Sequence, residues 1–395
     1  MYKYKWFYPC ILLLVLFACS QKENTTLETI KINPDEFVNV PEKGTDWIET
    51  VKFLPIISDG EHFIPDDAQL KFRDDYILAG NMDKILIFNS EGEFINEISK
   101  KGKGPEEYLF IGDYDLIPAS QEIVIIGSKK LHFYTINGDF IEAVNIPFMR
   151  MSVAAISKDR FACMLGRERS SWAFDQPLNY QLVILNRKGE IIDKRFEFPF
   201  SSVNFPSHNE IQQSADHESL LFHMYFDYHV YSIDQAGKID IKYTLDYGDL
   251  ASDTAFLQKP ELETMPNIFP HVNGRLGVSN SVSESSNTLC LSIGSDKKQK
   301  MTYQMINRNS RNQFTLIMGE DAVLSEFHGW PIYPTRGATG DFLYQPMQAI
   351  DVVEIMETLS NDQKNKLAKF PGFKKLSSVK EDDELVFFFY KVKDF

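Results

Sequence analysis

Short apolar runs broken by turn residues dominate the chain from Trp47 onward. The runs are rich in Val, Ile, Phe and Tyr and the breaks contain Gly, Asn and Asp, which is the pattern of β-strands joined by tight turns. Four breaks share one order of residues: a large apolar residue, three turn residues, a glycine, a charged residue and a second apolar residue. Their glycines are Gly92, Gly138, Gly189 and Gly237. Because glycine readily adopts the positive φ that a short hairpin turn requires, each break predicts a hairpin.

These four glycines repeat at a nearly constant interval. They are 46, 51 and 48 residues apart, and a period near 48 fits one four-stranded propeller blade, for which known repeats run roughly 40 to 50 residues. The chain from Trp47 to its end has room for about seven such units, but longer insertions in the second half favour six. We therefore predict an all-β fold, a six-bladed β-propeller of four-stranded antiparallel blades.

The second half of the chain is less regular. Leu250 to Val278 has the composition of an inserted loop. Met347 to Leu367 carries apolar residues at helical spacing, which predicts a short helical insertion near the C-terminus. Glu384 to Lys393 and Trp47 to Pro55 are strand candidates at the two ends of the domain. A closed ring needs both in one blade, because an open propeller leaves exposed sheet edges.

The N-terminus has the pattern of an export signal. Basic residues precede the apolar run Ile11 to Ala18, which is too short to cross a bilayer as a helix. The run ends at Leu16-Phe-Ala-Cys19 and resembles a bacterial lipobox, with Phe17 bulkier than the usual residue. We predict a signal peptide over 1–18, a lipidated Cys19 with a flexible tether over 19–45, and the propeller over 46–395. The alternative is an ordinary secretory signal with an incidental cysteine.

Three further stretches carry a resemblance to a known family. Lys101-Gly-Lys-Gly-Pro-Glu-Glu-Tyr108 is similar to a blade exit loop of that family, with Glu106 replacing a glycine. Phe226 to Tyr231, followed by Tyr243 to Gly248, is similar to its mid-chain strand pair, and Leu385 to Val392 is similar to its terminal strand. The chain resembles the six-bladed β-propeller lipoproteins of Gram-negative bacteria, related in shape to NHL and TolB propellers.

The resemblance implies a propeller and a place in the cell envelope. The protein is then an outer-membrane lipoprotein, attached to the membrane through its lipid and facing the periplasm or the cell surface. The resemblance implies no established activity and supplies no catalytic residue. The leaflet, the ligand and the oligomeric state stay open.

Charge narrows the range of partners. The chain has 56 acidic and 41 basic residues, a net charge of −15, and no dense run of Lys and Arg. Nucleic-acid binding needs a clustered basic surface, so we expect no nucleic-acid partner. Cys163 and Cys290 lie in apolar, strand-like settings, which favours buried free thiols and leaves a disulfide between them open.

Motifs for metal, phosphate or hydrolytic chemistry are incomplete or absent. Gly102-Lys103-Gly104-Pro105 lacks the hydroxyl residue of a phosphate-binding loop, so a turn between blades is favoured, with Lys103 facing the channel or its rim. The sequence has neither a nucleophile elbow nor a His-Glu-x-x-His motif. Four histidines, His208, His217, His223 and His229, are close in sequence but lack a ligand pattern. We expect no metal and no cofactor; calcium in the channel is unsupported, because no calcium-loop motif exists.

Aromatic residues near probable loops are the better functional signal. Trp172, Trp330 and Tyr333 stand beside polar, Pro and Gly residues, and Arg336 follows closely. An exposed aromatic platform with polar neighbours suits a glycan or peptide. The sequence therefore favours a binding or interaction scaffold for a glycan, a peptide or an envelope protein. The alternative is a propeller enzyme, a carbohydrate lyase or hydrolase with its site at the channel mouth.

Overall fold

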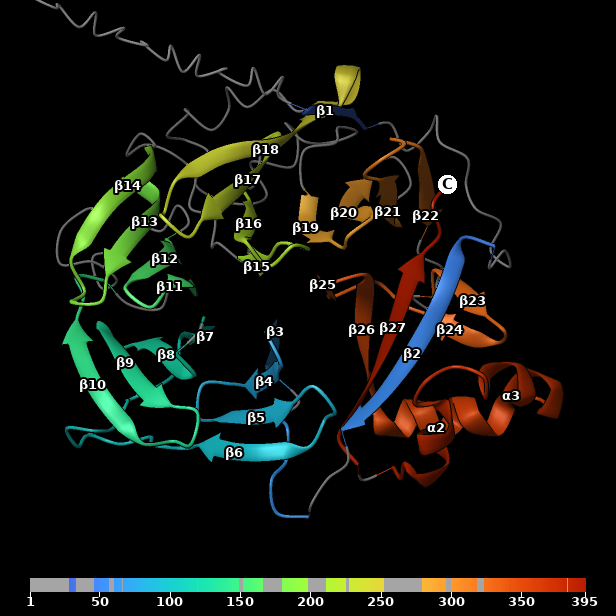
Figure 1. Ribbon diagram of the computed structural model, residues 1–395, viewed down its shortest axis with the longest axis horizontal. Coiled ribbons are helices and arrows are strands. Elements are labelled where there is room, and N and C mark those ends of the chain that lie inside the picture. The colour runs from blue at the N-terminus through green and yellow to red at the C-terminus, as the bar shows by residue number, and fades with distance from the viewer. Residues whose placement is uncertain are drawn as a thin grey trace, which may run out of the picture.

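The computed structural model shows a closed ring of sheets. It describes residues 28–32, 46–56, 60–65, 67–118, 120–148, 152–165, 180–197, 211–224, 227–251, 279–295, 300–317, 323–381 and 383–395. Within these residues, six four-stranded antiparallel blades stand around a common centre, and one of their sheets carries a fifth, parallel strand at its outer edge (Figure 1). The six-bladed propeller expected from the glycine spacing is confirmed.

Blades 1 to 3 follow one another along the chain, each from its innermost to its outermost strand. Their strands are β3 (Gln69–Arg73), β4 (Tyr76–Gly80), β5 (Ile85–Asn89) and β6 (Phe94–Ile98) in blade 1, β7 (Asp113–Ile117), β8 (Glu122–Gly127), β9 (Lys130–Thr135) and β10 (Phe140–Asn145) in blade 2, and β11 (Ser152–Ser157), β12 (Arg160–Met164), β13 (Tyr180–Asn186) and β14 (Ile191–Glu197) in blade 3.

Blades 4 and 5 repeat this order, and blade 6 draws on both ends of the domain. Their strands are β15 (Gln212–Gln213), β16 (Ser219–His223), β17 (His229–Asp234) and β18 (Ile239–Asp246) in blade 4, β19 (Ser279–Glu284), β20 (Thr288–Ser295), β21 (Lys300–Asn307) and β22 (Gln313–Ile317) in blade 5, and β25 (Gly337–Thr339), β26 (Phe342–Gln348), β27 (Leu385–Val392) and β2 (Ile48–Ile56) in blade 6.

The four repeated glycines turn the chain from the third to the fourth strand of blades 1 to 4. Gly92, Gly138, Gly189 and Gly237 have φ values of 81°, 84°, 80° and 84°. In the first turn, the Gly92 N–H donates to the Asn89 carbonyl at 3.0 Å, and the other three turns repeat this bond. The positive φ inferred from the sequence is thus present in all four hairpins.

Strand β2 closes the ring. It pairs antiparallel with β27 from Ile48 opposite Val392 to Ile56 opposite Leu385. The first strand of the domain therefore forms the outer edge of the last blade, as the two strand candidates at the chain ends predicted. Each blade of the described ring then has a neighbouring blade on both sides.

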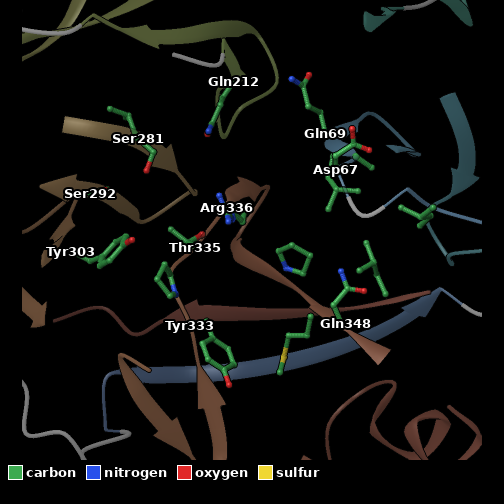
Figure 2. A pocket seen from close by; sticks show the side chains of 18 of the residues that line it. Asp67, Gln69, Gln212, Ser281, Ser292, Tyr303, Tyr333, Thr335, Arg336 and Gln348 are labelled. Atoms are coloured by element: carbon green, nitrogen blue, oxygen red, sulfur yellow. The ribbon is translucent and has the colours of Figure 1, made fainter. Parts of the chain in front are cut away.

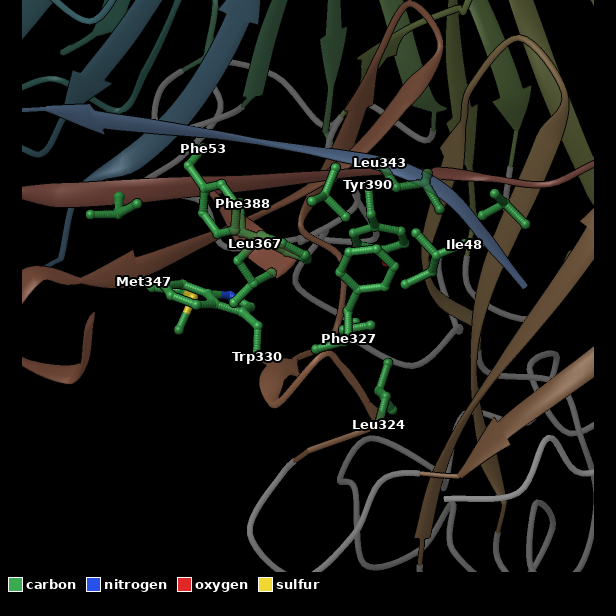
Figure 3. Close-up of a cluster of buried hydrophobic side chains, with 14 of the residues drawn as sticks. Ile48, Phe53, Leu324, Phe327, Trp330, Leu343, Met347, Leu367, Phe388 and Tyr390 are labelled. Atoms are coloured by element: carbon green, nitrogen blue, oxygen red, sulfur yellow. The ribbon is translucent and has the colours of Figure 1, made fainter. Parts of the chain in front are cut away.

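The helical insertion lies against the outside of blade 6. It comprises α2 (Ala349–Thr358), α3 (Asn361–Leu367) and the 3₁₀ helix η3 (Phe373–Ser378), between β26 and β27 (Figure 1). A two-stranded hairpin, β23 (Ser325–Phe327) and β24 (Trp330–Ile332), joins them in one hydrophobic core (Figure 3). None of the helices in the described ranges has the length and apolar character needed to cross a bilayer.

One short strand lies inside the stretch expected to be a flexible tether. Strand β1 (Glu28–Lys31) runs parallel to β18 along the outer edge of blade 4 (Figure 1). Ile30 and Ile32 are buried beneath it, so the alternation of apolar and polar residues over this short segment is that of a half-buried strand. The tether assignment is corrected there. A single-turn 3₁₀ helix, η1 (Gly248–Leu250), follows β18.

Candidate functional site

Ion pairs and hydrogen bonds join the innermost strands of blades 1 to 3. Lys71 on β3 forms an ion pair with Asp113 on β7, and Arg73 forms one with Asp115, both at 2.7 Å. All four residues alternate with apolar neighbours, so the charged side chains of each strand share one face. Asp115 is 0% exposed. A buried carboxylate needs such a partner, because desolvation disfavours its charged form.

The same two carboxylates also bind the third blade. Asp113 accepts the Val153 N–H at 2.7 Å and Asp115 accepts the Ala155 N–H at 2.9 Å, both from β11. Cation, carboxylate and N–H each recur two residues further along their strands, so two parallel rows of bonds cross the three blades. These side chains are used in holding the ring together.

The other side of the ring opens into a pocket of about 910 Å³. Its walls come from blades 1, 4, 5 and 6, at the end where their innermost strands begin: Gln69 starts β3, Gln212 starts β15, Ser281 lies early in β19, and Arg336 directly precedes β25 (Figure 2). A volume of this size fits a small ligand. The pocket at the channel mouth is the candidate site.

Arg336 lies at the centre of this opening on a fixed backbone. Its N–H donates to the Tyr344 carbonyl at 2.9 Å. The Thr335 hydroxyl lies 2.8 Å from the Gly337 carbonyl and 3.0 Å from the Tyr344 carbonyl. A Cβ on Gly337 would lie 2.5 Å from the Tyr344 hydroxyl, so a larger residue there would force the buried Tyr344 ring to shift.

The guanidinium of Arg336 is solvent-exposed and has no carboxylate partner among the described residues. Four other described arginines do have one: Arg73, Arg187, Arg195 and Arg308. A cation that points into a pocket without such a partner is available to a ligand.

Hydroxyl and amide groups surround this cation. Figure 2 shows the side chains of Gln69, Gln212 and Gln348 on different sides of Arg336, with Ser281 and Ser292 nearby. Each of these groups both donates and accepts hydrogen bonds. Part of the remaining wall is apolar and is formed by residues such as Leu70, Leu221, Pro346 and Met347.

Three carboxylates lie at the boundary of blades 1 and 6. Glu384 is only 8% exposed and accepts the Ile64 N–H at 2.8 Å. Asp67 is exposed and accepts from the Asn81 amide at 3.0 Å, and Asp351 lies in the first turn of α2. The pocket therefore has a cation at its centre and acids on one side.

His223 contributes a neutral side chain to the wall. Burial lowers the pKa of His223, and its Nδ1 lies 2.9 Å from the His229 carbonyl. The two histidines end β16 and begin β17, which pair antiparallel, so the chain reverses its direction between them. His208 lies outside the described residues. No group of three His, Cys, Asp or Glu side chains in the described ranges could hold a metal ion.

The predicted site residues fall into three groups by their place in the structure. Arg336 and Tyr333 line the pocket, and the Tyr333 N–H donates to the Gln345 side chain at 2.7 Å. Trp172 and the proposed lipidation site Cys19 lie outside the described residues. Trp330 and Lys103 lie away from the pocket.

Trp330 is a core residue. It is 0% exposed, its ring centroid is 4.8 Å from that of Phe53, and it stacks on Phe388 at 5.9 Å (Figure 3). Hairpin β23–β24 turns the indole inward, where blade 6 and the helical insertion cover it. Of the Gly and Pro residues beside Trp330, Gly329 forms the turn and Pro331 lies within β24, so they do not mark an exposed platform.

Lys103 lies on an exposed loop that satisfies its own backbone. The Gly104 N–H donates to the Glu107 carboxylate at 2.7 Å, and the Gly102 N–H donates to the Tyr108 carbonyl at 2.9 Å. Glu107 thus takes the position that an anion would occupy in a phosphate-binding loop. The loop connects blades 1 and 2, as the sequence favoured, but Lys103 is not among the pocket residues.

Cys163 and Cys290 are buried free thiols in blades 3 and 5. Burial raises the pKa of Cys290 to about 12 and raises that of Cys163 as well. Neither thiol is poised to react, and the open question of a disulfide between them is answered.

The sequence missed most of the pocket, although one signal for it existed. Gln69, Asp113 and Gln212 stand 23, 25 and 25 residues before the turn glycines of their blades. Counting back from Gly92, Gly138 and Gly237 therefore finds the innermost strands of blades 1, 2 and 4, but not that of blade 3, where β11 starts 37 residues before Gly189. It does not find Ser292, Gln348 or Glu384, which reach the pocket from other strands and connections.

Two solved structures of Bacteroides proteins share this fold. A candidate exported protein of Bacteroides fragilis covers 93% of this chain with 100% of its own length, at 16% identity and a TM-score of 0.70. A member of the DUF4221 family from Bacteroides vulgatus covers 88% with 98% of its length, at 12% identity and a TM-score of 0.50. At such identities the likeness concerns the fold alone.

The sequence comparison gives the family. No curated protein matches the chain. A family model described as a domain of unknown function, DUF4934, matches residues 28–391 and so spans the ring from β1 into β27. The chain is a member of the DUF4934 family.

Proposed function

We propose that this protein is an exported β-propeller that binds a small polar ligand, a glycan or a peptide, in the pocket at its channel mouth. The observation that carries the proposal is the pocket itself: about 910 Å³, lined from four blades, with the Arg336 guanidinium at its centre and no carboxylate paired with it among the described residues. A rigid ring that presents convergent polar groups around a cavity is suited to binding.

We further propose that a lipid on Cys19 anchors the protein to the outer membrane, as in the NHL- and TolB-like lipoproteins that the sequence resembles. The support is the apolar run before Cys19 and the description of the Bacteroides fragilis neighbour as exported. Labelled palmitate should be incorporated into the full chain and not into Cys19→Ser. Equal labelling of both would overturn the anchor and leave the pocket proposal standing.

Binding is tested with the protein from residue 20 onward, screened by calorimetry against neutral and acidic oligosaccharides and short peptides. Ser281→Trp fills the pocket from β19, and the matched control Ser377→Trp places the same ring on the exposed surface of η3. A ligand found in the screen should bind the parent and Ser377→Trp alike and lose at least roughly ten-fold in affinity with Ser281→Trp. A ligand unaffected by Ser281→Trp, or a screen without any ligand, would refute the proposal.

A propeller enzyme is the second candidate. It requires ionisable side chains from several blades at the channel mouth, and Asp67, His223, Arg336 and Glu384 come to the pocket from blades 1, 4 and 6. Incubation with each oligosaccharide that binds, followed by chromatography for shortened products, distinguishes the two functions. Turnover that Glu384→Gln abolishes favours the enzyme; intact ligand after prolonged incubation favours the binding protein.

A further inference from the structure

We propose that the ligand is a saccharide with a single carboxylate, bound by Arg336 through that carboxylate and by the surrounding amides and hydroxyls through its hydroxyl groups. The inference rests on the proposed binding function and deepens it by naming the chemical class.

The carboxylate is inferred from Arg336. A guanidinium presents a planar fork of N–H donors that matches a carboxylate in a bidentate geometry. The four arginines with carboxylate partners are used within the protein, whereas Arg336 points into the pocket and has no such partner among the described residues. Because Thr335 and Tyr344 fix its backbone, little conformational entropy of the main chain is lost on binding.

The saccharide is inferred from the groups around Arg336. Sugar hydroxyls donate and accept hydrogen bonds, as do the amides of Gln69, Gln212 and Gln348 and the hydroxyls of Ser281 and Ser292. A peptide that entered with its C-terminal carboxylate would bring apolar side chains against these groups, and burial of polar groups without hydrogen bonds is unfavourable.

The limit of one carboxylate is inferred from Asp67, Asp351 and Glu384. Three carboxylates at the boundary of blades 1 and 6 leave the described pocket residues with more negative than positive charge. They can accept hydrogen bonds from sugar hydroxyls, but they repel a second anionic group. A polyanionic chain is therefore disfavoured.

Four probes of equal length test the three inferences, namely the carboxylate, the saccharide and the limit of one carboxylate. They are an oligosaccharide with one terminal uronate, the same compound with its carboxylate reduced to an alcohol, a polyuronate, and a short peptide with a free C-terminus. Binding is measured by calorimetry at low and high salt. The mono-uronate should bind at least about ten-fold more tightly than its reduced analogue, the range expected for a charge-assisted pair. It should also bind more tightly than the polyuronate.

The variants are Arg336→Gln and the control Arg195→Gln, which removes the same charge from an exposed residue of β14. Arg336→Gln should abolish the preference for the carboxylate and leave the affinity for the reduced analogue within about three-fold. Arg195→Gln should change neither. Thermal melting verifies that both variants are folded.

The possible failures are distinguishable. Equal affinity of the parent protein for uronate and reduced analogue, or a preference that survives Arg336→Gln, overturns the role of Arg336. Tightest binding of the polyuronate overturns the single carboxylate. Binding of the peptide alone overturns the saccharide and leaves the binding function standing, whereas binding of no probe and of no compound in the wider screen overturns the binding function itself.

Discussion

Burial in the folded ring determines the protonation state of His132 on β9. The side chain is 2% exposed and packs edge-on against the Tyr108 ring. Burial, assisted by the nearby Lys130, lowers the pKa of His132 from 6.5 to about 4. The imidazole is therefore neutral in the folded ring over a range of pH in which it is largely charged in the unfolded chain.

The consequence is an acid-dependent loss of stability. As the pH falls below 6.5, His132 binds a proton in the unfolded chain but stays unprotonated in the folded protein. The contribution of this group to the free energy of unfolding therefore declines until about pH 4 and then levels off. The full effect is about 3 kcal/mol. Urea unfolding at pH 7.5, 6, 5 and 4 should show a steeper decline for the parent than for His132→Gln.

His223 also has a lowered pKa and is retained in both proteins, so the difference between the two profiles isolates His132. Profiles that run parallel over this range would contradict the assignment.

The pocket shows which residues could be recognised from sequence. Arg336 and Tyr333 were singled out because they stand beside Pro and Gly in a probable loop, and both do line the pocket. The same argument selected Trp330, which is buried. Composition around a residue indicates a turn, but the direction of the side chain at that turn depends on what packs against it.

At the scale of elements, the hairpin turns are the part of the fold that the sequence predicts best. A turn glycine acts through its own backbone, so its effect is visible without knowledge of distant contacts. The four turns are nevertheless not equivalent in their surroundings. A Cβ on Gly189 would lie 2.3 Å from the Asn145 carbonyl oxygen, whereas the nearest atom to a Cβ on Gly237 is 3.4 Å away.

This difference gives a matched pair of substitutions. Gly237→Ala should cost about 1–2 kcal/mol, from the left-handed backbone alone. Gly189→Ala should cost at least about 1 kcal/mol more, because the backbone of blade 2 must also move. Urea unfolding of both variants measures the two costs. Equal losses would show that the contact with Asn145 relaxes freely.

The rows of bonds from β3 through β7 to β11 were not found from the sequence. Asp113 and Asp115 have the spacing of neighbours on one strand face, but their partners Lys71 and Arg73 stand 42 positions earlier. The link is between blades and needs the register of two strands. Local patterns do not contain that register.

At the scale of the whole molecule, ring closure depends on β2. Removing residues 1–45 deletes β1 and leaves the pairing of β2 with β27 intact; removing residues 1–56 deletes both. The shorter deletion should yield a folded protein with a modestly lower melting temperature. The longer one should yield insoluble or molten protein, because the outer edge of blade 6 and Phe388 lose their cover.

Melting curves and gel filtration of both deletions test this closure. A soluble, cooperatively melting protein without β2 would show that the remaining three strands of blade 6 close the ring by themselves.

The sequence by itself determined the number of blades, the hairpin turns, the closing strands and the helical insertion. Each of these follows from a local period or from the conformation of one residue, and such signals survive in a single chain. The pocket was decided by the tertiary structure. Its walls come from segments as far apart as Ile64 and Leu385, and only the packing of the blades turns Arg336 toward the centre of the channel and Trp330 into the core.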